Sequence, residues 1–582
     1  MTRFSGSIKN NAEHTGSTAR IKFIAVLFLV LAAVFLSRLF YLQVFKHGLY
    51  KTMAIAQHEN TQKLLPARGM IYAVDKDGRE FCIADNQDLY LLFAVPVEID
   101  NATLTVEKIV SVLNMEEQEK VKVLNQLKKN NDPYEPLKHY LNEEEKNKLK
   151  DLNIVGLGFS KETKRYYPEG DVFAHLNGFV GFSEDKAMGQ YGLEEFFETE
   201  LRGKNGMLKS ETDPAGHLIA VGEYDVVPAE GGSSLYLNID PVVQLKACET
   251  LKKAVKNYEA QGGVVIIQNP NDGAILALCV EPSFDPNNYG QVENVNFFIN
   301  QAISSLYEPG SIFKPITMAA ALDTQSVEPD TTYEDKGILV YGKDKITNAM
   351  DKKYGVVNMT QVLENSINTG AVFAAVATGR ENMKKYISDF GFGAHLGIDL
   401  PREAKGDVNS LDKKSDIYLA TASFGQGIAV TPLQMINAFS AIANGGILYK
   451  PWVVKKIVKV DGEVEEFTAQ QIRRVISSKS ANVLKAMLVS VVKNGHSGVA
   501  KIPGYFVAGK TGTAQIPAKN GGYLNAYNHS FVGFAPATKP RFTLFVKITN
   551  PAKGAFAEST AGPVFAEIMK YLLNYYQVPT DE

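Results

Sequence analysis

The stretch Tyr307-Glu308-Pro309-Gly310-Ser311-Ile312-Phe313-Lys314 connects a predicted turn to an apolar helix over Ile312 to Leu322. Proline and glycine together are typical of a turn. Residues i and i+3 of a helix share a face, so the Lys314 amine can reach the Ser311 hydroxyl. A lysine that is desolvated enough to be neutral can accept the serine proton. Pro315 has no N–H and favours a tight opening turn, so the pattern predicts a serine nucleophile beside its base.

Two further motifs follow this one in a fixed order. Ser366-Ile367-Asn368 lies in a predicted helical stretch over Thr360 to Ala377, and Lys510-Thr511-Gly512-Thr513 follows an extended segment over Tyr505 to Ala508. Single matches have little weight, because the chain has chance S-x-x-K matches and one chance S-x-N match, which begin at Ser183, Ser410, Ser490 and Ser480. The ordered triple, with the last motif in a strand setting, predicts an active site.

The segment that carries these motifs has strands at both ends and helices between them. Gly262 to Gln268 and Ala274 to Val280 flank the turn Pro270-Asn271-Asp272-Gly273, which predicts a β-hairpin. Phe531 to Ala535 and Phe542 to Ile548 form a second strand pair, and a helix is expected over Gly562 to Tyr576. Together with the intervening helical patterns, including Thr431 to Ala443, this order predicts a mixed α/β domain whose sheet joins strands distant in sequence.

The preceding half of the chain shows no catalytic motif. Met70 to Val74 and Leu89 to Val95 are predicted strands, and the charge-rich Glu116 to Lys150 is predicted as helices with a solvated face, broken at Asn131-Asp132-Pro133. Pro228, Gly231 and Gly232 interrupt the pattern, so we expect the main domain boundary between Val227 and Ser234.

Residues Ile21 to Val44 are apolar enough to cross a membrane once. About 20 residues at roughly 1.5 Å each match the hydrocarbon thickness, and Arg38 can extend to the interface. No small-residue cleavage site follows, which favours an anchor over a signal peptide. The basic residues before the span outnumber the single Glu13 and predict a cytoplasmic N-terminus with the rest of the chain exported; they are Arg3, Lys9, Arg20 and Lys22.

Composition excludes several other classes of function. The 582 residues have a net charge of -3, from 61 basic and 64 acidic side chains, so nucleic acid is not an expected partner. Cys82, Cys248 and Cys279 are far apart and odd in number; they indicate neither a disulfide framework nor a zinc site and are interpreted as small buried residues. No phosphate loop or ligand cluster is visible, so we expect no metal, nucleotide or prosthetic group.

The three motifs match the S-x-x-K, S-x-N and K-T-G set of penicillin-binding proteins and serine β-lactamases. The resemblance covers almost the whole chain from Arg38 onward and points to the class B penicillin-binding proteins. Stretches that resemble this family are Arg38 to Gln43, Arg68-Gly69-Met70-Ile71-Tyr72, Arg165-Tyr166-Tyr167-Pro168, His175 to Gly181, Gly189 to Glu194, Phe424-Gly425-Gln426-Gly427, Thr431 to Gln434 and Phe531 to Pro536.

The resemblance implies four parts in order along the chain. They are a cytoplasmic tail (1–20), a transmembrane helix (21–44), an α+β pedestal of the penicillin-binding protein dimerisation type (45–230), and a transpeptidase domain (231–582). The last part is expected to have a central antiparallel sheet flanked by helices.

The resemblance also implies a role for each motif residue. Ser311 attacks the penultimate D-alanine carbonyl of a donor stem peptide, Lys314 is its base, and Ser366 relays a proton between Lys314, Lys510 and the leaving amine. Asn368 hydrogen-bonds the substrate amide. Lys510, with Thr511 and Thr513, holds the donor carboxylate. Gly512 lets the peptide lie against the strand, and the N–H groups of Ser311 and Thr513 form the oxyanion hole.

The expected function is D,D-transpeptidation of peptidoglycan stem peptides outside the cytoplasmic membrane, with β-lactams as inhibitors. Tyr307 to Gly310 and Glu281 to Asn287 look closer to the septal, cell-division type, whose partners include division membrane proteins and a glycan polymerase. Elongation-specific and sporulation-specific roles remain alternatives. So do hydrolysis of the acyl-serine, disfavoured by the long exported pedestal, and a chiefly scaffolding protein. The segment after the anchor does not resemble a glycosyltransferase.

Four other side chains have two interpretations each. His175 and His529 are not spaced for a triad with Ser311 and are interpreted as structural histidines, although His529 precedes a strand near the expected site. Tyr523 and Tyr527 follow the catalytic strand and either line the substrate cleft or cap it.

Overall fold

The computed structural model describes residues 15–51, 59–129, 134–183, 186–211, 224–518 and 520–581. The chain divides into two compact units, residues 1–66 with 204–230, and residues 67–203 with 231–582. Arg3, Lys9 and Glu13, on which the predicted orientation partly rests, lie outside the described residues, as does Asn131-Asp132-Pro133. The boundary near residue 230 stays a prediction.

The first unit contains the predicted membrane anchor. Helix α1 (Thr15–Phe40) continues into one π-helical turn (Tyr41–Phe45), and the apolar segment Ala19–Phe45 is long enough to cross a bilayer. Strands β1 (Glu59–Leu64), β8 (Gly206–Glu211) and β9 (Tyr224–Val227) form an antiparallel sheet in the order β1-β8-β9.

The second unit begins with a mixed sheet built around one long strand, β3 (Glu80–Ala94). Its order is β19-β18-β10-β2-β3-β4, and β5 also pairs with β3. The other strands are β2 (Ile71–Val74), β4 (Glu135–Leu141), β5 (Leu157–Tyr166), β10 (Ser234–Leu237), β18 (Val454–Val458) and β19 (Val464–Glu466). The predicted strands at residues 70–74 and 89–95 are therefore confirmed.

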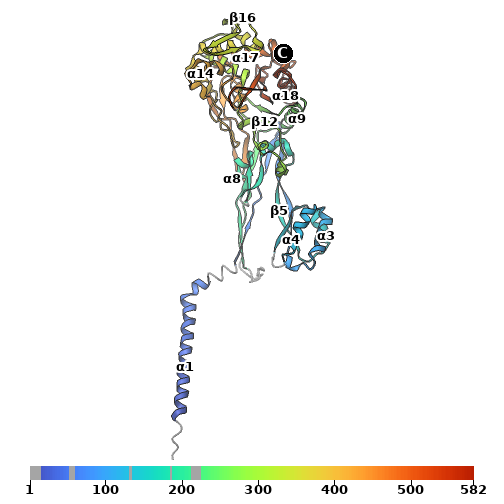
Figure 1. Ribbon diagram of the computed structural model, residues 1–582, viewed down its shortest axis with the longest axis vertical. Helices are drawn as coiled ribbons and strands as arrows, with labels where there is room; N and C mark the ends of the chain where they lie inside the picture. Colours follow the sequence, from blue (N-terminus) through green and yellow to red (C-terminus); the bar gives the residue numbers. More distant parts are fainter. Residues whose placement is uncertain are drawn as a thin grey trace, which may run out of the picture. The chain divides into compact units, whose positions relative to one another are not determined.

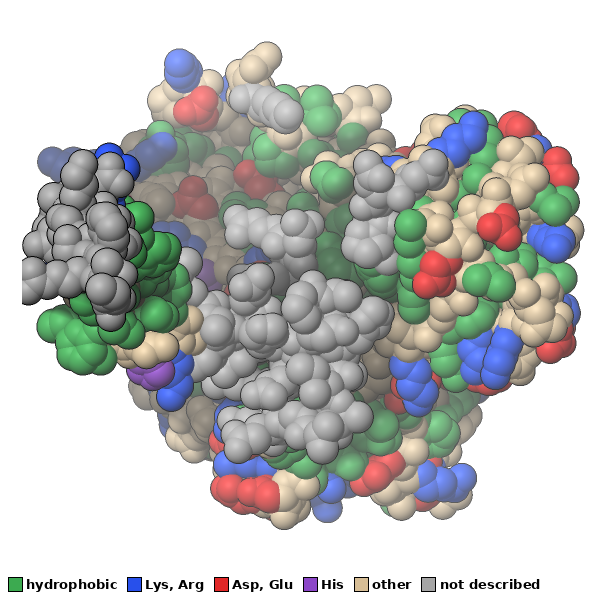
Figure 2. Space-filling model, turned by 90° about the horizontal axis from the view of Figure 1, so that it is seen from below, with side chains coloured by type: hydrophobic (Ala, Val, Ile, Leu, Met, Phe, Trp, Pro, Cys, Tyr) green, Lys and Arg blue, Asp and Glu red, His purple; other side chains and the backbone are tan. Residues whose placement is uncertain are grey.

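A small helical cluster packs beside β3 and β4. It contains α3 (Ala102–Leu113), α4 (Glu117–Leu127) and α5 (Glu143–Asp151), around a core that includes Ile109 and Leu127. The expectation of helices alone over residues 116–150 was wrong, because β4 lies between α4 and α5. Its sequence does not alternate apolar and polar residues, so the strand is determined by its pairing with β3. On the face shown in Figure 2, basic and acidic side chains are interspersed and do not gather into patches of one sign.

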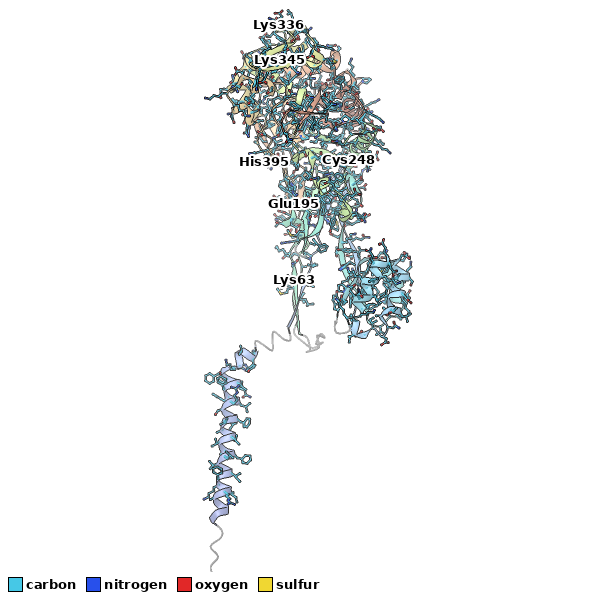
Figure 3. All side chains as sticks on the ribbon, viewed as in Figure 1. Lys63, Glu195, Cys248, Lys336, Lys345 and His395 are labelled. Carbon is cyan, nitrogen blue, oxygen red and sulfur yellow. A yellow bond between two sulfur atoms is a disulfide. The ribbon has the colours of Figure 1, made fainter. Side chains whose placement is uncertain are left out.

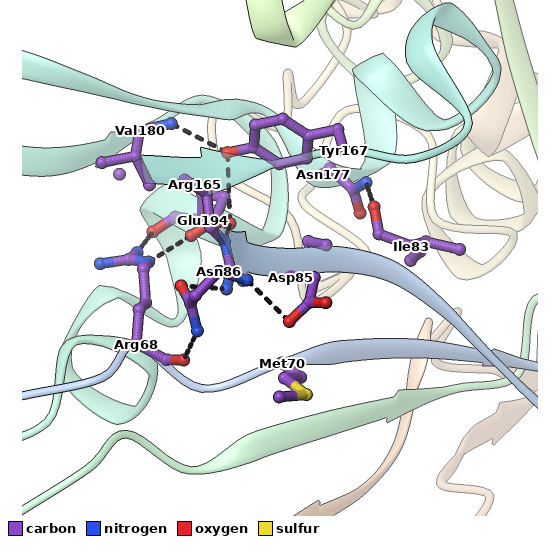
Figure 4. A network of polar contacts seen from close by, with 12 residues as sticks. Arg68, Met70, Ile83, Asp85, Asn86, Arg165, Tyr167, Asn177, Val180 and Glu194 are labelled. Carbon is purple, nitrogen blue, oxygen red and sulfur yellow. Dashed lines mark hydrogen bonds and ion pairs between the residues drawn. The ribbon is translucent and has the colours of Figure 1, made fainter. Parts of the chain in front are cut away.

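A buried carboxylate joins three segments of the second unit (Figure 4). Glu194 is fully buried and accepts hydrogen bonds from Arg68 Nε at 2.6 Å, Arg165 Nε at 2.7 Å and the Tyr167 hydroxyl at 3.3 Å. Burial alone would raise the pKa of Glu194, but the two guanidinium groups outweigh it and lower the pKa. Short elements surround this network: α6 (Ala174–Asn177), β6 (Phe179–Ser183), β7 (Lys186–Gln190), α7 (Gly192–Phe196) and α8 (Glu198–Arg202).

The part of the second unit that carries the three motifs is built on a five-stranded antiparallel sheet of order β12-β11-β23-β22-β21. The strands are β11 (Gly262–Gln268), β12 (Ile275–Glu281), β21 (Ala508–Pro517), β22 (Tyr523–Ala535) and β23 (Phe542–Thr549). Both predicted strand pairs are confirmed. The sheet joins strands from the two ends of the domain, as the sequence predicts.

Helices cover both faces of this sheet (Figure 1). Helices α9 (Pro241–Asn257) and α18 (Ala561–Tyr575) share a core with Val265, Phe531 and Val546. The alternate strand positions, such as Val264 and Phe545, pack with helices of the other face. These helices are α10 (Gln301–Ser304), α11 (Lys314–Asp323), α12 (Met359–Glu364), α13 (Asn368–Thr378), α14 (Arg380–Asp389), α15 (Asp416–Ala422), α16 (Pro432–Ala443) and α17 (Ser478–Asn494).

Three short strand pairs complete this part of the second unit. They are β13 (Thr332–Asp335) with β16 (Gly355–Asn358), β14 (Ile338–Tyr341) with β15 (Asp344–Thr347), and β17 (Ile447–Tyr449) with β20 (Gln471–Arg474).

A disulfide joins α9 to β12, between Cys248 and Cys279 (Figure 3 labels Cys248). The interpretation of all three cysteines as unpaired small residues was therefore wrong for two of them, while Cys82 is a free, half-buried thiol. Spacing along the chain gave no sign of this pair, which forms because the helix packs on the edge strand. Such bonds persist in oxidising compartments outside the cytoplasm.

We predict that Glu194→Gln destabilises the full-length protein by about 3–5 kcal/mol, since it leaves Arg165 buried without its counter-ion. Because the pKa of Glu194 is lowered in the folded state, this contribution is present above the ordinary glutamate pKa and is lost as pH falls. Thermal melting in detergent at neutral pH measures the effect. Asp88→Asn, which breaks an exposed pair with Lys161, is the control and should leave the melting temperature unchanged. Equal melting of all three proteins would contradict the prediction.

Candidate active site

The predicted nucleophile lies on a tight turn. Residues Gly310–Phe313 form a 3-10 turn that leads directly into α11, and the N–H of Lys314 donates to the Ser311 carbonyl. The tight opening turn predicted from Pro315 is confirmed. Ile312 and Phe313 are fully buried, so the turn is anchored from below while Ser311 is partly exposed.

A glycine from another segment supports this turn. The N–H of Gly310 donates to the Gly425 carbonyl at 3.0 Å. A Cβ at Gly425 would lie 2.3 Å from the Gly310 oxygen, and its φ of +79° is in the region that favours glycine. The Phe424-Gly425-Gln426-Gly427 stretch therefore buttresses the Ser311 turn through close backbone contact.

Lys314, the last residue of the first motif, is buried where this motif packs against the second. Its Nζ donates to the Ser366 hydroxyl at 3.1 Å and to the Ser366 carbonyl, and its side chain is 1% exposed. Burial, followed by the positive charge of Lys510, lowers the pKa of Lys314 well below the ordinary lysine value. The amine is thereby shifted toward the neutral form that a base requires.

Ser366 lies at a break between α12 and α13, and its φ is +54°. The expectation that this motif lies within one helix was wrong. The left-handed residue ends the first helix, and the second begins at Asn368, which turns Ser366 toward Lys314. Asn368 Nδ2 donates to the Thr347 carbonyl at 2.9 Å, and its backbone N–H donates to Asn348 Oδ1 at 3.0 Å.

The third motif lies in edge strand β21, as predicted. Lys510 is fully buried, and its Nζ donates to the Thr511 carbonyl at 3.1 Å. Burial lowers the pKa of Lys510 to about 8, against an opposing effect from Glu558. The Thr513 hydroxyl accepts a hydrogen bond from the Ala557 N–H at 3.1 Å.

Gly512 lies where the third motif packs against the Ser311 turn. A Cβ there would lie 2.8 Å from Ser530 Oγ, 3.0 Å from Ile312 Cγ2 and 3.2 Å from the Pro309 oxygen. The missing side chain faces the protein interior, where β21 packs closely on the Ser311 turn. Close packing of the first motif on the third therefore favours glycine here.

These motifs surround one cleft of about 720 Å³. Ser311, Ser366, Asn368, Thr511 and Thr513 line it, whereas Lys314 and Lys510 lie buried behind the lining. The structure therefore brings all three motifs together, with hydroxyl and amide groups at the surface of the cleft and both amines below it.

Several side chains in the cleft had no signal in the sequence. Lys352, His496, Phe556 and Glu558 line it, but none belongs to a recognisable short motif, and loops distant in sequence bring them there. Tyr527 lines the cleft too. Tyr523, for which lining and capping were both open, donates to Glu308 Oε2 at 3.0 Å.

His175 and His529 are buried, as expected of structural histidines. His175 Nε2 lies 2.9 Å from the Phe297 carbonyl, and His529 Nδ1 lies 2.9 Å from Thr560 Oγ1. Burial lowers the pKa of each to about 4. The part of the chain that the structure describes contains no group of three or more His, Cys, Asp or Glu side chains placed to hold a metal ion.

Two family models match the chain. One described as "Penicillin binding protein transpeptidase domain" matches residues 263–570, and one described as "Penicillin-binding Protein dimerisation domain" matches residues 63–237. The chain belongs to the class B penicillin-binding proteins. In this penicillin-binding protein the three active-site motifs all lie within the first of these matches.

Similar proteins span almost its whole length. "Stage V sporulation protein D" of Bacillus subtilis (strain 168) is 33% identical over 564 residues, which cover 95% of this chain and 85% of the relative. "Peptidoglycan D,D-transpeptidase FtsI" of Escherichia coli (strain K12) is 29% identical over 582 residues, covering 98% and 95%. The crystal structure of Penicillin Binding Protein 2X from Streptococcus thermophilus matches with a TM-score of 0.75 at 22% identity, covering 88% and 80%, and shows the same fold.

We predict that acylation by benzylpenicillin slows as pH rises through about 8, because Lys510, to which the family resemblance assigns the ligand carboxylate, loses its charge. The second-order acylation rate constant, measured from pH 6 to 10, gives the profile. Lys510→Arg should remove this alkaline decline, even if its overall rate is lower, since arginine stays charged.

Lys547 provides a matched control, because burial also lowers its pKa to about 8. Lys547→Met should keep the alkaline decline. Loss of the decline in Lys547→Met, or its persistence in Lys510→Arg, would contradict the assignment.

Proposed function

We propose that this penicillin-binding protein is a peptidoglycan D,D-transpeptidase whose acyl-enzyme forms on Ser311. Neutral Lys314 takes the Ser311 proton as the hydroxyl oxygen attacks the penultimate D-alanine carbonyl of a donor stem peptide. The N–H groups of Ser311 and Thr513 stabilise the oxyanion. Ser366 passes a proton to the leaving amine, so the peptide bond breaks, terminal D-alanine departs and an ester remains on Ser311.

The second half of the reaction uses an acceptor amine. The amine nitrogen attacks the carbonyl of the Ser311 ester and gives up a proton to the Lys314–Ser366 pair. The ester bond then breaks, a new amide forms, and the Ser311 oxygen regains its proton. The same ester can be resolved by water, which would make the protein a carboxypeptidase or β-lactamase. Family membership over both the pedestal and the catalytic domain supports cross-linking instead.

The observation that carries the proposal is the position of Lys314. A fully buried amine 3.1 Å from the Ser366 hydroxyl, at the foot of the Ser311 turn, has the lowered pKa that a general base needs. Asn368, Thr511 and Thr513 line the cleft beside it, where a peptide amide and a terminal carboxylate can bind. The absence of a side chain at Gly512 keeps β21 close to the nucleophile turn.

We further propose that the anchor places the N-terminus in the cytoplasm and the catalytic domain outside, where its substrate lies. A septal role in cell division, beside division membrane proteins and a glycan polymerase, is supported by likeness to FtsI relatives. A sporulation role is the second candidate, because Stage V sporulation protein D is 33% identical. Depletion and rescue of the protein, described next, also test an elongation role and a chiefly scaffolding role.

We predict that depletion of the protein in its own organism produces filamentous cells, and that Ser311→Ala fails to restore division. Rounded cells would instead indicate elongation, and normal growth with defective spores would indicate sporulation. Ser410→Ala, in a chance S-x-x-K sequence, is the matched control and should restore division fully. Full rescue by Ser311→Ala would show that the chemistry is dispensable and that the protein acts as a scaffold.

A further inference from the structure

The active-site cleft contains one carboxylate that the reaction described above does not use. Among the described residues that line the cleft, Glu558 is the single carboxylate, and Lys352 and His496 are the basic side chains. Lys314 and Lys510 add two buried amines behind the lining. Glu558 is thus a half-buried negative charge in a site built to receive a negatively charged ligand.

Glu558 lies in a short 3-10 turn, Ala557–Ser559, between β23 and α18. This turn contacts β21 at both threonines of the third motif. The Thr511 hydroxyl donates to Glu558 Oε1 at 3.3 Å, and the Thr513 hydroxyl accepts from the Ala557 N–H at 3.1 Å. These are the two hydroxyls to which the proposed function assigns the terminal carboxylate of the donor.

We propose that Glu558 occupies the carboxylate subsite when no ligand is bound. Its carboxylate accepts the hydrogen bond of the Thr511 hydroxyl until the carboxylate of the donor stem or of a β-lactam replaces it. This inference rests on the proposed function and concerns the specificity of the same site. A ligand carboxylate that binds Thr511 competes with Glu558 for the same hydrogen and is repelled by its charge. Glu558 therefore lowers the affinity of the subsite for anions and is a specificity-determining residue.

The charge of Glu558 also affects the pKa values of the basic side chains around it. Burial lowers the pKa of Lys510 to about 8, and burial, together with the neighbouring lysines, also lowers the pKa of His496; the negative charge of Glu558 opposes both shifts. Removing the Glu558 charge should therefore lower the pKa of Lys510 further. The subsite would then bind anions more strongly while Lys510 is charged, and it would lose this cation at a lower pH than the native protein does.

Acylation by benzylpenicillin and by its uncharged methyl ester tests this inference on the full-length protein in detergent, with adducts counted by intact mass. At pH 6, well below the pKa of Lys510, Glu558→Gln should react about three- to tenfold faster than the native protein with the acid and at the native rate with the ester. The alkaline decline with the acid should also begin at lower pH. Glu558→Asp keeps the charge and should stay near the native acid-to-ester ratio.

Glu567→Gln, a carboxylate on the following helix paired with Lys246, is the control and should match the native protein with both ligands. An unchanged or lower rate of Glu558→Gln with the acid, or an equal gain with acid and ester, would overturn the inference while leaving the Ser311 chemistry intact. Absence of any Ser311 adduct in the native protein would contradict the proposed function and this inference together.

Discussion

The burial of the Lys314 amine is the constraint on which the active site depends. An ammonium group is costly to remove from water, and the nearby Lys510 raises that cost, so the neutral form is favoured. The protein keeps the amine in place through Ser366, whose left-handed backbone directs both its hydroxyl and its carbonyl at Nζ. Folding the first two motifs against each other thus lowers the pKa of the proposed base and also fixes its position.

The rest of the transpeptidase domain fixes the first motif relative to the other two. Ile312 and Phe313 anchor the nucleophile turn in the core, while Gly425 and Gly512 allow two other segments to approach it closely. Because β21 belongs to a sheet covered by helices on both faces, the third motif is fixed relative to the first. In the pedestal, Glu194 joins distant stretches of the chain, because it forms ion pairs with both Arg68 and Arg165.

Motif order and hydrophobic periodicity predicted much of this structure from the sequence. The anchor, both strand pairs, the tight turn at Ser311 and the meeting of three motifs followed from local patterns. Strand β4, the break at Ser366 and the Cys248–Cys279 bond did not, since each is determined by packing between segments far apart in sequence. Glu558 and His496 reach the cleft from loops for the same reason, and no short motif marks them.

The central claim is that Ser311 forms the covalent acyl-enzyme. Intact-protein mass after exposure to benzylpenicillin, followed by peptide mapping, tests it most directly. The account predicts one penicillin adduct per chain, located on Ser311, and no adduct in Ser311→Ala. An adduct on another residue, or undiminished labelling of Ser311→Ala, would contradict the account.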